Sequence, residues 1–282
     1  MPASPALPMA DAPMSSPEQF QIEHNGVRMQ GLAQGTGEPV LLVHGMPSSL
    51  NVWRFILERV ASRYRVIAMD LPGFGQSTKV ALPSLDAFAD WLVRLLDHFS
   101  LPSAHVVGHS FGGLISLALL DKQPRRLRSL VLSDTVGLGP YTGGEFQRMV
   151  ATARTADDIR AALHWTIHDP RFISQPLVDG YVAYVNHPGV PELLEKLTAL
   201  RPEWESYIST TLHKINLPLL VVWGRDDRSV PVELAERLRH VPGARFVVFD
   251  NCGHAPMVER AEDFGTHLLD FLDGVVQRDA KH

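Results

Sequence analysis

Short apolar segments rich in Val, Leu and Ile alternate with longer amphipathic segments along most of the chain. The segment that begins at Phe20 is already strand-like. Six further apolar segments predict strands, at residues 40–44, 65–70, 105–108, 127–134, 217–224 and 245–250. Apolar runs this short are typical of strands that are covered on both faces.

The amphipathic segments between those strands predict helices, at residues 52–62, 85–99, 111–122, 232–239 and 262–275. A regular alternation of strand and helix is typical of a parallel sheet with helices on both sides. The sequence therefore predicts an α/β fold with a doubly wound, mostly parallel sheet.

This alternation is interrupted between Asp134 and Lys214. The intervening segment has no convincing strand pattern and predicts helices, at residues 145–155, 156–168, 177–186, 191–200 and 203–213. A helical block inside an α/β pattern is best explained as an insertion over the ends of the strands. We therefore expect an α/β core at residues 18–134 and 214–282, with a helical cap at residues 135–213.

The composition is that of an ordinary globular protein, because 45% of the 282 residues are hydrophobic and 20% are charged. Acidic residues (31) outnumber basic ones (26), and no run of Lys or Arg breaks that balance. A nucleic acid or an anionic membrane is therefore not expected as a partner. The expected partner is a small-molecule substrate, and a homodimer is compatible with the sequence.

The first 17 residues are rich in Pro, Ala, Ser and Met, without a basic start or an unbroken apolar run. They indicate a disordered leader rather than a secretory signal. The single cysteine, Cys252, excludes an intramolecular disulfide and suits a reducing compartment, so a cytoplasmic location is expected. The sequence has no apolar run long enough to span a membrane.

A G-x-S-x-G motif at residues 108–112 lies directly after a predicted strand and opens a predicted helix. A nucleophile placed between strand and helix needs a sharp turn, and only glycine fits two residues to either side of it. The motif therefore predicts Ser110 as the nucleophile. The start of the next helix offers free N–H groups that can stabilise negative charge.

The strand at residues 40–44 ends in His-Gly, which leaves the next backbone N–H facing the space above the sheet. Acyl transfer needs two such donors for the tetrahedral oxyanion, each worth roughly 2.7–4 kcal/mol. We assign this oxyanion hole to the backbone N–H groups of Met46 and Phe111, since Pro47 cannot donate. His44 is a weaker candidate for a base, because a histidine at a strand end more often braces its loop.

Two neighbouring acids, Asp226 and Asp227, follow the strand at 217–224, and His254 follows the strand at 245–250. The chain order of serine, acid and histidine is the one expected when each residue extends from a successive strand end. His254 would remove the proton of Ser110, and a buried carboxylate would orient and neutralise the resulting imidazolium.

Five ordered motifs together resemble the α/β-hydrolase superfamily, and they lie at residues 44–47, 70–77, 108–113, 224–231 and 251–254. The resemblance implies that the catalytic acid is Asp227, with Asp226 at a variable position. Asp134 is the position where some relatives keep their acid. Within the superfamily, the sequence is similar to capped bacterial esterases and to carbon–carbon hydrolases of aromatic-ring degradation.

The predicted cap is rich in aromatic and histidine side chains: Tyr141, Phe146, His164, Trp165, His168, Tyr181, Tyr184, Trp204 and Tyr207. Some of these side chains should face the site, so we expect a mostly apolar substrate. His164 and His168 have a spacing that could bind zinc, but no nearby Cys or Glu completes a tetrahedral set. We therefore expect neither a metal nor an organic cofactor.

The sequence thus predicts a serine hydrolase that cleaves a carboxylic ester, or a related acyl bond, through an acyl-enzyme. The nearest alternative is a carbon–carbon hydrolase that acts on a vinylogous diketone with the same triad. Members of that group commonly have Trp directly after the catalytic histidine, whereas this chain has Ala255, and Arg201 is a candidate for binding the substrate's acid group. A ligand receptor on a hydrolase scaffold is the second alternative.

Overall fold

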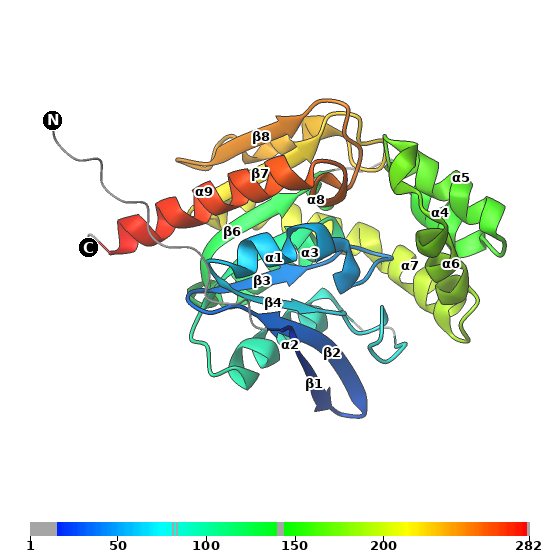
Figure 1. Ribbon diagram of the computed structural model, residues 1–282, viewed down its shortest axis with the longest axis horizontal. Helices are drawn as coiled ribbons and strands as arrows, with labels where there is room; N and C mark the ends of the chain where they lie inside the picture. The colour runs from blue at the N-terminus through cyan, green and yellow to red at the C-terminus, as the bar shows by residue number, and fades with distance from the viewer. Residues whose placement is uncertain (1–15, 81, 83, 140–143, 281–282) are drawn as a thin grey trace, which may run out of the picture.

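An eight-stranded sheet runs through the centre of the structure (Figure 1). The computed structural model describes residues 16–80, 82, 84–139 and 144–280. The strand order is β1-β2-β4-β3-β5-β6-β7-β8, with antiparallel pairing of β2 to β1 and β4 and parallel pairing elsewhere. The strands are β1 (Glu18–His24), β2 (Val27–Gln34), β3 (Pro39–Val43), β4 (Arg65–Met69), β5 (Ala104–His109), β6 (Leu127–Ser133), β7 (Leu219–Gly224) and β8 (Arg245–Phe249).

The expected doubly wound, mostly parallel sheet is confirmed, and all six expected strands are present. The strand-like segment near Phe20 forms a hairpin of β1 and β2 at the edge of the sheet. Asn25 and Gly26 turn this hairpin with positive φ angles of 51° and 73°, the conformation that a two-residue hairpin turn favours.

Alternate residues of β3 face two different hydrophobic cores, which is why the strand is apolar throughout. Leu41 and Val43 belong to the core that includes side chains of α2 (Leu85–His98) and α3 (Phe111–Lys122). Val40 and Leu42 belong to the core that includes α1 (Arg54–Ala61) and α9 (Ala261–Asp279). Helices therefore cover both faces of the sheet.

Shorter helical segments complete the fold outside the β6–β7 connection: η1 (Leu50–Trp53), η2 (Pro124–Arg126), η5 (Val232–Leu238) and α8 (Pro256–Glu259). The helix expected at residues 232–239 is therefore a 3-10 helix in the structure. Pro231 directly precedes it, and only Ala235 and Leu238 of its residues are buried. With so small an apolar face, this segment has little packing to hold a regular α-helix.

Helices fill the connection between β6 and β7: α4 (Glu145–Thr152), α5 (Ala156–Thr166), η3 (Pro170–Phe172), α6 (Gln175–Val185), α7 (Val190–Ser209) and η4 (Leu212–Lys214). We call α4 to α7 the helical insertion. The described residues of this connection contain no strand. The division of the chain into core and cap at residues 135 and 213 stays a prediction.

The expectation of two separate helices at residues 191–200 and 203–213 is wrong, because α7 is continuous and contains Pro202. A proline inside a helix costs about 3 kcal/mol. Leu197 and Trp204, seven residues apart, are both buried in the same core, while Pro202 is exposed. Burial of this apolar face on both sides of the proline holds the helix together.

The helical insertion contacts loops at the carboxyl ends of the strands. The Tyr181 hydroxyl donates to Pro47 O (2.8 Å), in the loop after β3, and the Tyr184 hydroxyl donates to Gly73 O (3.2 Å), in the loop after β4. His254 N, in the loop after β8, donates to Thr166 O at 2.7 Å. Figure 1 shows α4, α5 and α6 gathered beyond that end of the sheet.

Several expectations fall on parts of the chain that the structure does not describe. Of the leader expected at residues 1–17, the structure describes only residues 16 and 17. It does not describe the side chains of Tyr141, Arg201 and Tyr207. No helix among the described residues is both long enough and apolar enough to cross a bilayer.

Candidate active site

Ser110 lies at a tight turn between β5 and α3. Its φ of 52° and ψ of −116° form a combination that residues with a side chain rarely adopt. Ser110 N donates to Ser133 O at 2.9 Å, and Ser110 O accepts from Leu114 N at 3.3 Å, so sheet and helix both hold the turn. Strain at a position fixed from both sides is typical of a functional residue.

The glycines of the G-x-S-x-G motif are required by close backbone contacts. A Cβ atom on Gly108 would lie 2.6 Å from Gly113 Cα, and one on Gly112 would lie 2.2 Å from Val43 O. Neither space admits a side chain, and the second contact packs the turn against the end of β3. The local fold therefore depends on glycine two residues before and two after Ser110.

The loop after β3 approaches Ser110 closely enough to supply an oxyanion donor. A Cβ atom on Gly45 would lie 2.9 Å from Ser110 Cβ. Met46 and Phe111, expected to form the oxyanion hole, line the same cavity as Ser110. Phe111 is the first residue of α3, where a backbone N–H has no partner within the helix. The structure thus brings the three residues together, and the donor roles stay predictions.

His44 uses both ring nitrogens to hold backbone groups. Nδ1 donates to Gly45 O at 2.7 Å, and Nε2 accepts from Leu71 N at 3.0 Å. The ring is fully buried, and burial lowers the pKa of His44 despite the nearby carboxylate of Asp70. A neutral ring with no free lone pair braces its loop and cannot act as a general base in this geometry.

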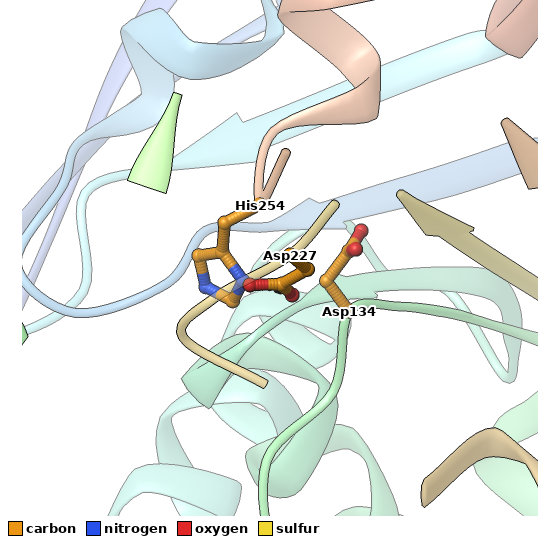
Figure 2. Close-up of side chains that lie close together, drawn as sticks. All are labelled: Asp134, Asp227 and His254. Atoms are coloured by element: carbon orange, nitrogen blue, oxygen red, sulfur yellow. Dashed lines mark hydrogen bonds and ion pairs between the residues drawn. The ribbon is translucent and has the colours of Figure 1, made fainter. Parts of the chain in front are cut away.

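His254 and Asp227 form the central hydrogen bond of the site (Figure 2). His254 Nδ1 donates to Asp227 Oδ2 at 2.7 Å, and both side chains are buried. Asp227 Oδ1 accepts from Ser229 N at 2.8 Å and from Val230 N at 2.9 Å, which fixes the carboxylate. With Nδ1 protonated, Nε2 is the nitrogen that can accept a proton.

Asp226, the neighbouring acid, faces the surface. Its side chain is 43% exposed and its Oδ2 lies 3.4 Å from His168 Nδ1, on the helical insertion side. The structure therefore brings Asp227, and not Asp226, to His254.

Asp134 is a second buried carboxyl group beside Asp227, which lies between it and His254 (Figure 2). Its Oδ1 accepts from Gly224 N at 2.9 Å, and Ser133 Oγ lies 2.8 Å from its Oδ2. Burial, followed by the charge of Asp227 and a hydrogen bond to it, raises the pKa of Asp134 well above its ordinary value. A neutral Asp134 can donate that hydrogen bond to Asp227.

One ligand atom each from Asp134, Asp227 and His254 lies within 4.8 Å of the others, a spacing that a metal ion could bridge. His254 Nδ1 already carries the proton that it donates to Asp227, and a metal needs that lone pair. The chemistry of this set therefore fits a chain of hydrogen bonds better than a metal site.

The backbone of His254 is held between the turn of Ser110 and the helical insertion. His109 Nε2 donates to His254 O at 2.7 Å, and the two rings lie 4.8 Å apart. His254 N donates to Thr166 O, at the end of α5, at 2.7 Å. Burial lowers the pKa of His109 well below its ordinary value, so its ring is neutral. Because His109 directly precedes Ser110, its hydrogen bond connects the turn of Ser110 to the loop that holds His254.

Glu259, which no sequence motif predicted, connects the loop of His254 to the helical insertion. Its Oε1 accepts from Gly253 N at 2.9 Å, and its Oε2 accepts from His168 N at 2.8 Å and Asp169 N at 3.0 Å. Only 9% of the residue is exposed. Its single helical turn, α8, carries no motif, so no local pattern predicts this role.

A small cavity opens at Ser110. It is lined by Met46, Ser110, Phe111, Leu114, Val136, Gln147, Leu197 and Trp204. Trp204 stacks on Phe111, with ring centroids 5.5 Å apart. The wall is thus mostly apolar, as the aromatic content of the predicted cap indicated, and no described residue that lines it is basic.

Comparisons with known proteins identify the family of this fold. The family described as "alpha/beta hydrolase fold" matches residues 38–261. A 2-hydroxymuconate semialdehyde hydrolase of a Pseudomonas species is 31% identical over 93% of this chain and 96% of its own length. The acetyltransferase component of the acetoin cleaving system of Pseudomonas putida is 30% identical over 91% of this chain and 69% of its own.

A solved structure of similar shape is the 2-hydroxy-6-oxo-6-phenylhexa-2,4-dienoate hydrolase of a Rhodococcus species. It superposes with a TM-score of 0.82 at 25% sequence identity, over 92% of this chain and 99% of the other. These proteins cleave or transfer different groups, so the comparisons identify a scaffold without selecting one reaction.

Proposed function

The chain belongs to the α/β-hydrolase family, and from this premise we propose that it hydrolyses a carboxylic ester of a small, mostly apolar substrate. Ser110, Asp227 and His254 are the proposed catalytic triad. The observation that carries the proposal is the buried hydrogen bond between His254 Nδ1 and Asp227 Oδ2, at 2.7 Å, in a loop that His109, the neighbour of Ser110, binds through His254 O.

Acylation begins when His254 Nε2 removes the proton of Ser110 as its oxygen attacks the ester carbonyl. The imidazolium that forms is held by Asp227, whose carboxyl group is fixed by two backbone N–H donors. The tetrahedral oxyanion is stabilised by the N–H groups of Met46 and Phe111. Collapse of this intermediate releases the alcohol, which takes its proton from His254, and leaves an acyl-enzyme.

Deacylation repeats these steps with water as the nucleophile. His254 removes a proton from the water, the hydroxide attacks the acyl carbonyl, and Ser110 leaves with the proton that His254 returns. The predominantly apolar walls of the cavity suit an apolar acyl group.

Carbon–carbon hydrolysis of a vinylogous diketone is the second candidate, since relatives with that activity in their names are 29–31% identical to this chain. Two features favour the ester. Ala255 follows the proposed catalytic histidine, and no described basic side chain lines the cavity to bind an acidic substrate.

Turnover of p-nitrophenyl butyrate tests the proposal. We expect hydrolysis well above the background rate, and Ser110→Ala to lose at least about 10⁴-fold in kcat, because the nucleophile acts together with His254 as a unit. A ligand receptor on this scaffold would show no turnover, and the variant would change nothing. Faster turnover of a 2-hydroxy-6-oxodienoate than of any ester would favour the carbon–carbon candidate.

A further inference from the structure

Gln147 is a polar side chain in the otherwise apolar wall of the Ser110 cavity. It lies in the first turns of α4, the first helix of the insertion, and only 8% of the residue is exposed. Apart from Ser110 itself, every other described residue that lines the cavity has an apolar side chain. Apart from Ser110, Gln147 is therefore the one described wall residue whose side-chain oxygen can accept a hydrogen bond from a ligand beside the nucleophile.

The side-chain oxygen of Gln147 has no hydrogen-bond partner within the described part of the chain. Its Oε1 is fully buried, and no described donor reaches it. A buried acceptor without a partner destabilises the protein, whereas an apolar side chain of similar size would fit the same wall at no such cost. An unpaired oxygen on a side chain that lines a binding cavity is explained if the ligand supplies its partner.

The position of the cavity indicates which part of the substrate meets Gln147. Ser110 and both residues proposed as oxyanion donors, Met46 and Phe111, line this cavity. The carbonyl carbon of the substrate must lie among these three residues. Two groups are attached to that carbon, the acyl chain and the alcohol oxygen, and we assign the acyl chain to the wall that holds Gln147 and Leu197.

We propose that Gln147 selects esters whose short acyl chain carries a hydrogen-bond donor, a hydroxyl or N–H group, which Gln147 Oε1 accepts. The inference rests on the proposed function and names its substrate class. The acyl chain is apolar where it contacts Leu114, Val136 and Trp204 and polar at one position. A site built around such a hydrogen bond rejects the analogue without the donor, because the buried acceptor is then left unpaired.

Matched esters test the inference directly. The p-nitrophenyl esters of butyrate, 3-hydroxybutyrate and 3-methoxybutyrate share a leaving group and differ at one acyl position, and both enantiomers of the last two are measured. We expect kcat/KM of one hydroxyl ester to exceed that of butyrate by about 10- to 100-fold. The methoxy ester, which can only accept a hydrogen bond, should gain nothing over butyrate.

The variant Gln147→Leu should abolish this preference by slowing the hydroxyl ester while sparing or improving the butyrate ester. The ratio of the two kcat/KM values is the readout, because it does not depend on the fraction of folded enzyme. Gln147→Met offers a second apolar replacement of similar length. Gln277→Leu, at an exposed position of α9, is the matched control and should keep the wild-type ratio.

Three results would overturn the inference. Equal kcat/KM values for the butyrate and hydroxybutyrate esters in the wild type would show that Gln147 selects nothing. The same conclusion would follow if Gln147→Leu and Gln147→Met left the ratio of these two kcat/KM values unchanged. A preference found only when the hydroxyl is placed on the alcohol portion would contradict the acyl assignment. An enzyme that turns over none of these esters would instead overturn the proposed function, and this inference with it.

Discussion

The carboxyl ends of the strands and the helical insertion meet at one cavity, but they are held in different ways. Asp227 and the Ser110 turn are fixed by backbone hydrogen bonds from the sheet and from the loops that directly follow it. The insertion contributes Gln147, Leu197 and Trp204 to the wall, and no described residue is a hydrogen-bond partner for the side-chain oxygen of Gln147.

Under the proposed function, this difference separates the residues that react from the residues that select the substrate. Residues that must keep a fixed geometry throughout catalysis extend from the sheet, where neighbouring strands leave little freedom. Residues that meet the variable part of a substrate come from the insertion, which can change without disturbing the sheet. The comparison predicts large losses of rate at the strand ends and changes of preference in the insertion.

The largest effect should come from the acid at the end of β7. Asp227→Asn keeps the shape of the side chain but removes the charge that holds the imidazolium, so kcat should fall by roughly 10³- to 10⁴-fold. Asp226→Asn, one residue away and exposed, is the control and should stay within about twofold of the wild type. Steady-state kinetics with p-nitrophenyl butyrate measures both. A comparable loss in the two variants would contradict the geometric assignment.

An intermediate effect should come from Glu259, where the two regions are joined. The two carboxylate oxygens of Glu259 accept hydrogen bonds from the loop of His254 and from the backbone of residues 168–169. Glu259→Gln replaces one of these acceptors by an NH2 donor. We expect kcat to fall by about tenfold with KM nearly unchanged, since the histidine is misplaced while the cavity wall is kept.

The control for this positioning role is Glu262→Gln, which alters an exposed glutamate in the first turn of α9. It should leave both constants unchanged. A rise in KM without a change in kcat for Glu259→Gln would show that the residue shapes the cavity and does not position His254.

The smallest effect on rate should come from Asp134, with a clear effect on stability instead. Because the pKa of this buried acid is raised, the folded protein keeps a proton on Asp134 that the unfolded chain loses above about pH 4. The free energy of unfolding therefore falls as pH rises, as far as this residue contributes to it. Asn cannot ionise and can still donate to Asp227. Asp134→Asn should therefore gain stability relative to the wild type between pH 5 and pH 8.

Urea unfolding of both proteins at several pH values measures this difference, because the other titrating groups are common to both. We expect kcat of Asp134→Asn to stay within about tenfold of the wild type. A loss of rate as large as that of Asp227→Asn would instead make Asp134 the essential acid.

The sheet, and the meeting of Asp227 with His254 at its edge, could be predicted from the sequence because both have short-range signals. Strand residues such as those of β3 are apolar on both faces, and the turn of Ser110 excludes side chains at Gly108 and Gly112. Each signal lies within a few residues of the feature that it predicts. The ordering of these signals along the chain then placed His254 and Asp227 at one edge of the sheet.

The insertion was predicted less well because its structure depends on long-range packing. Whether α7 continues through Pro202 depends on the burial of Trp204, which cannot be read from a local pattern. Gln147 and Glu259 are single polar residues without a motif. Their importance comes from apolar neighbours in one case and from distant backbone donors in the other.

Fluorophosphonate labelling followed by peptide mapping tests the central claim most directly, since this reagent reports an activated serine without any assumption about the substrate. We expect a single covalent adduct on the peptide that contains Ser110, formed much more slowly in His254→Ala. Labelling on another residue, or labelling of Ser110 that is equally fast without the imidazole, would contradict it.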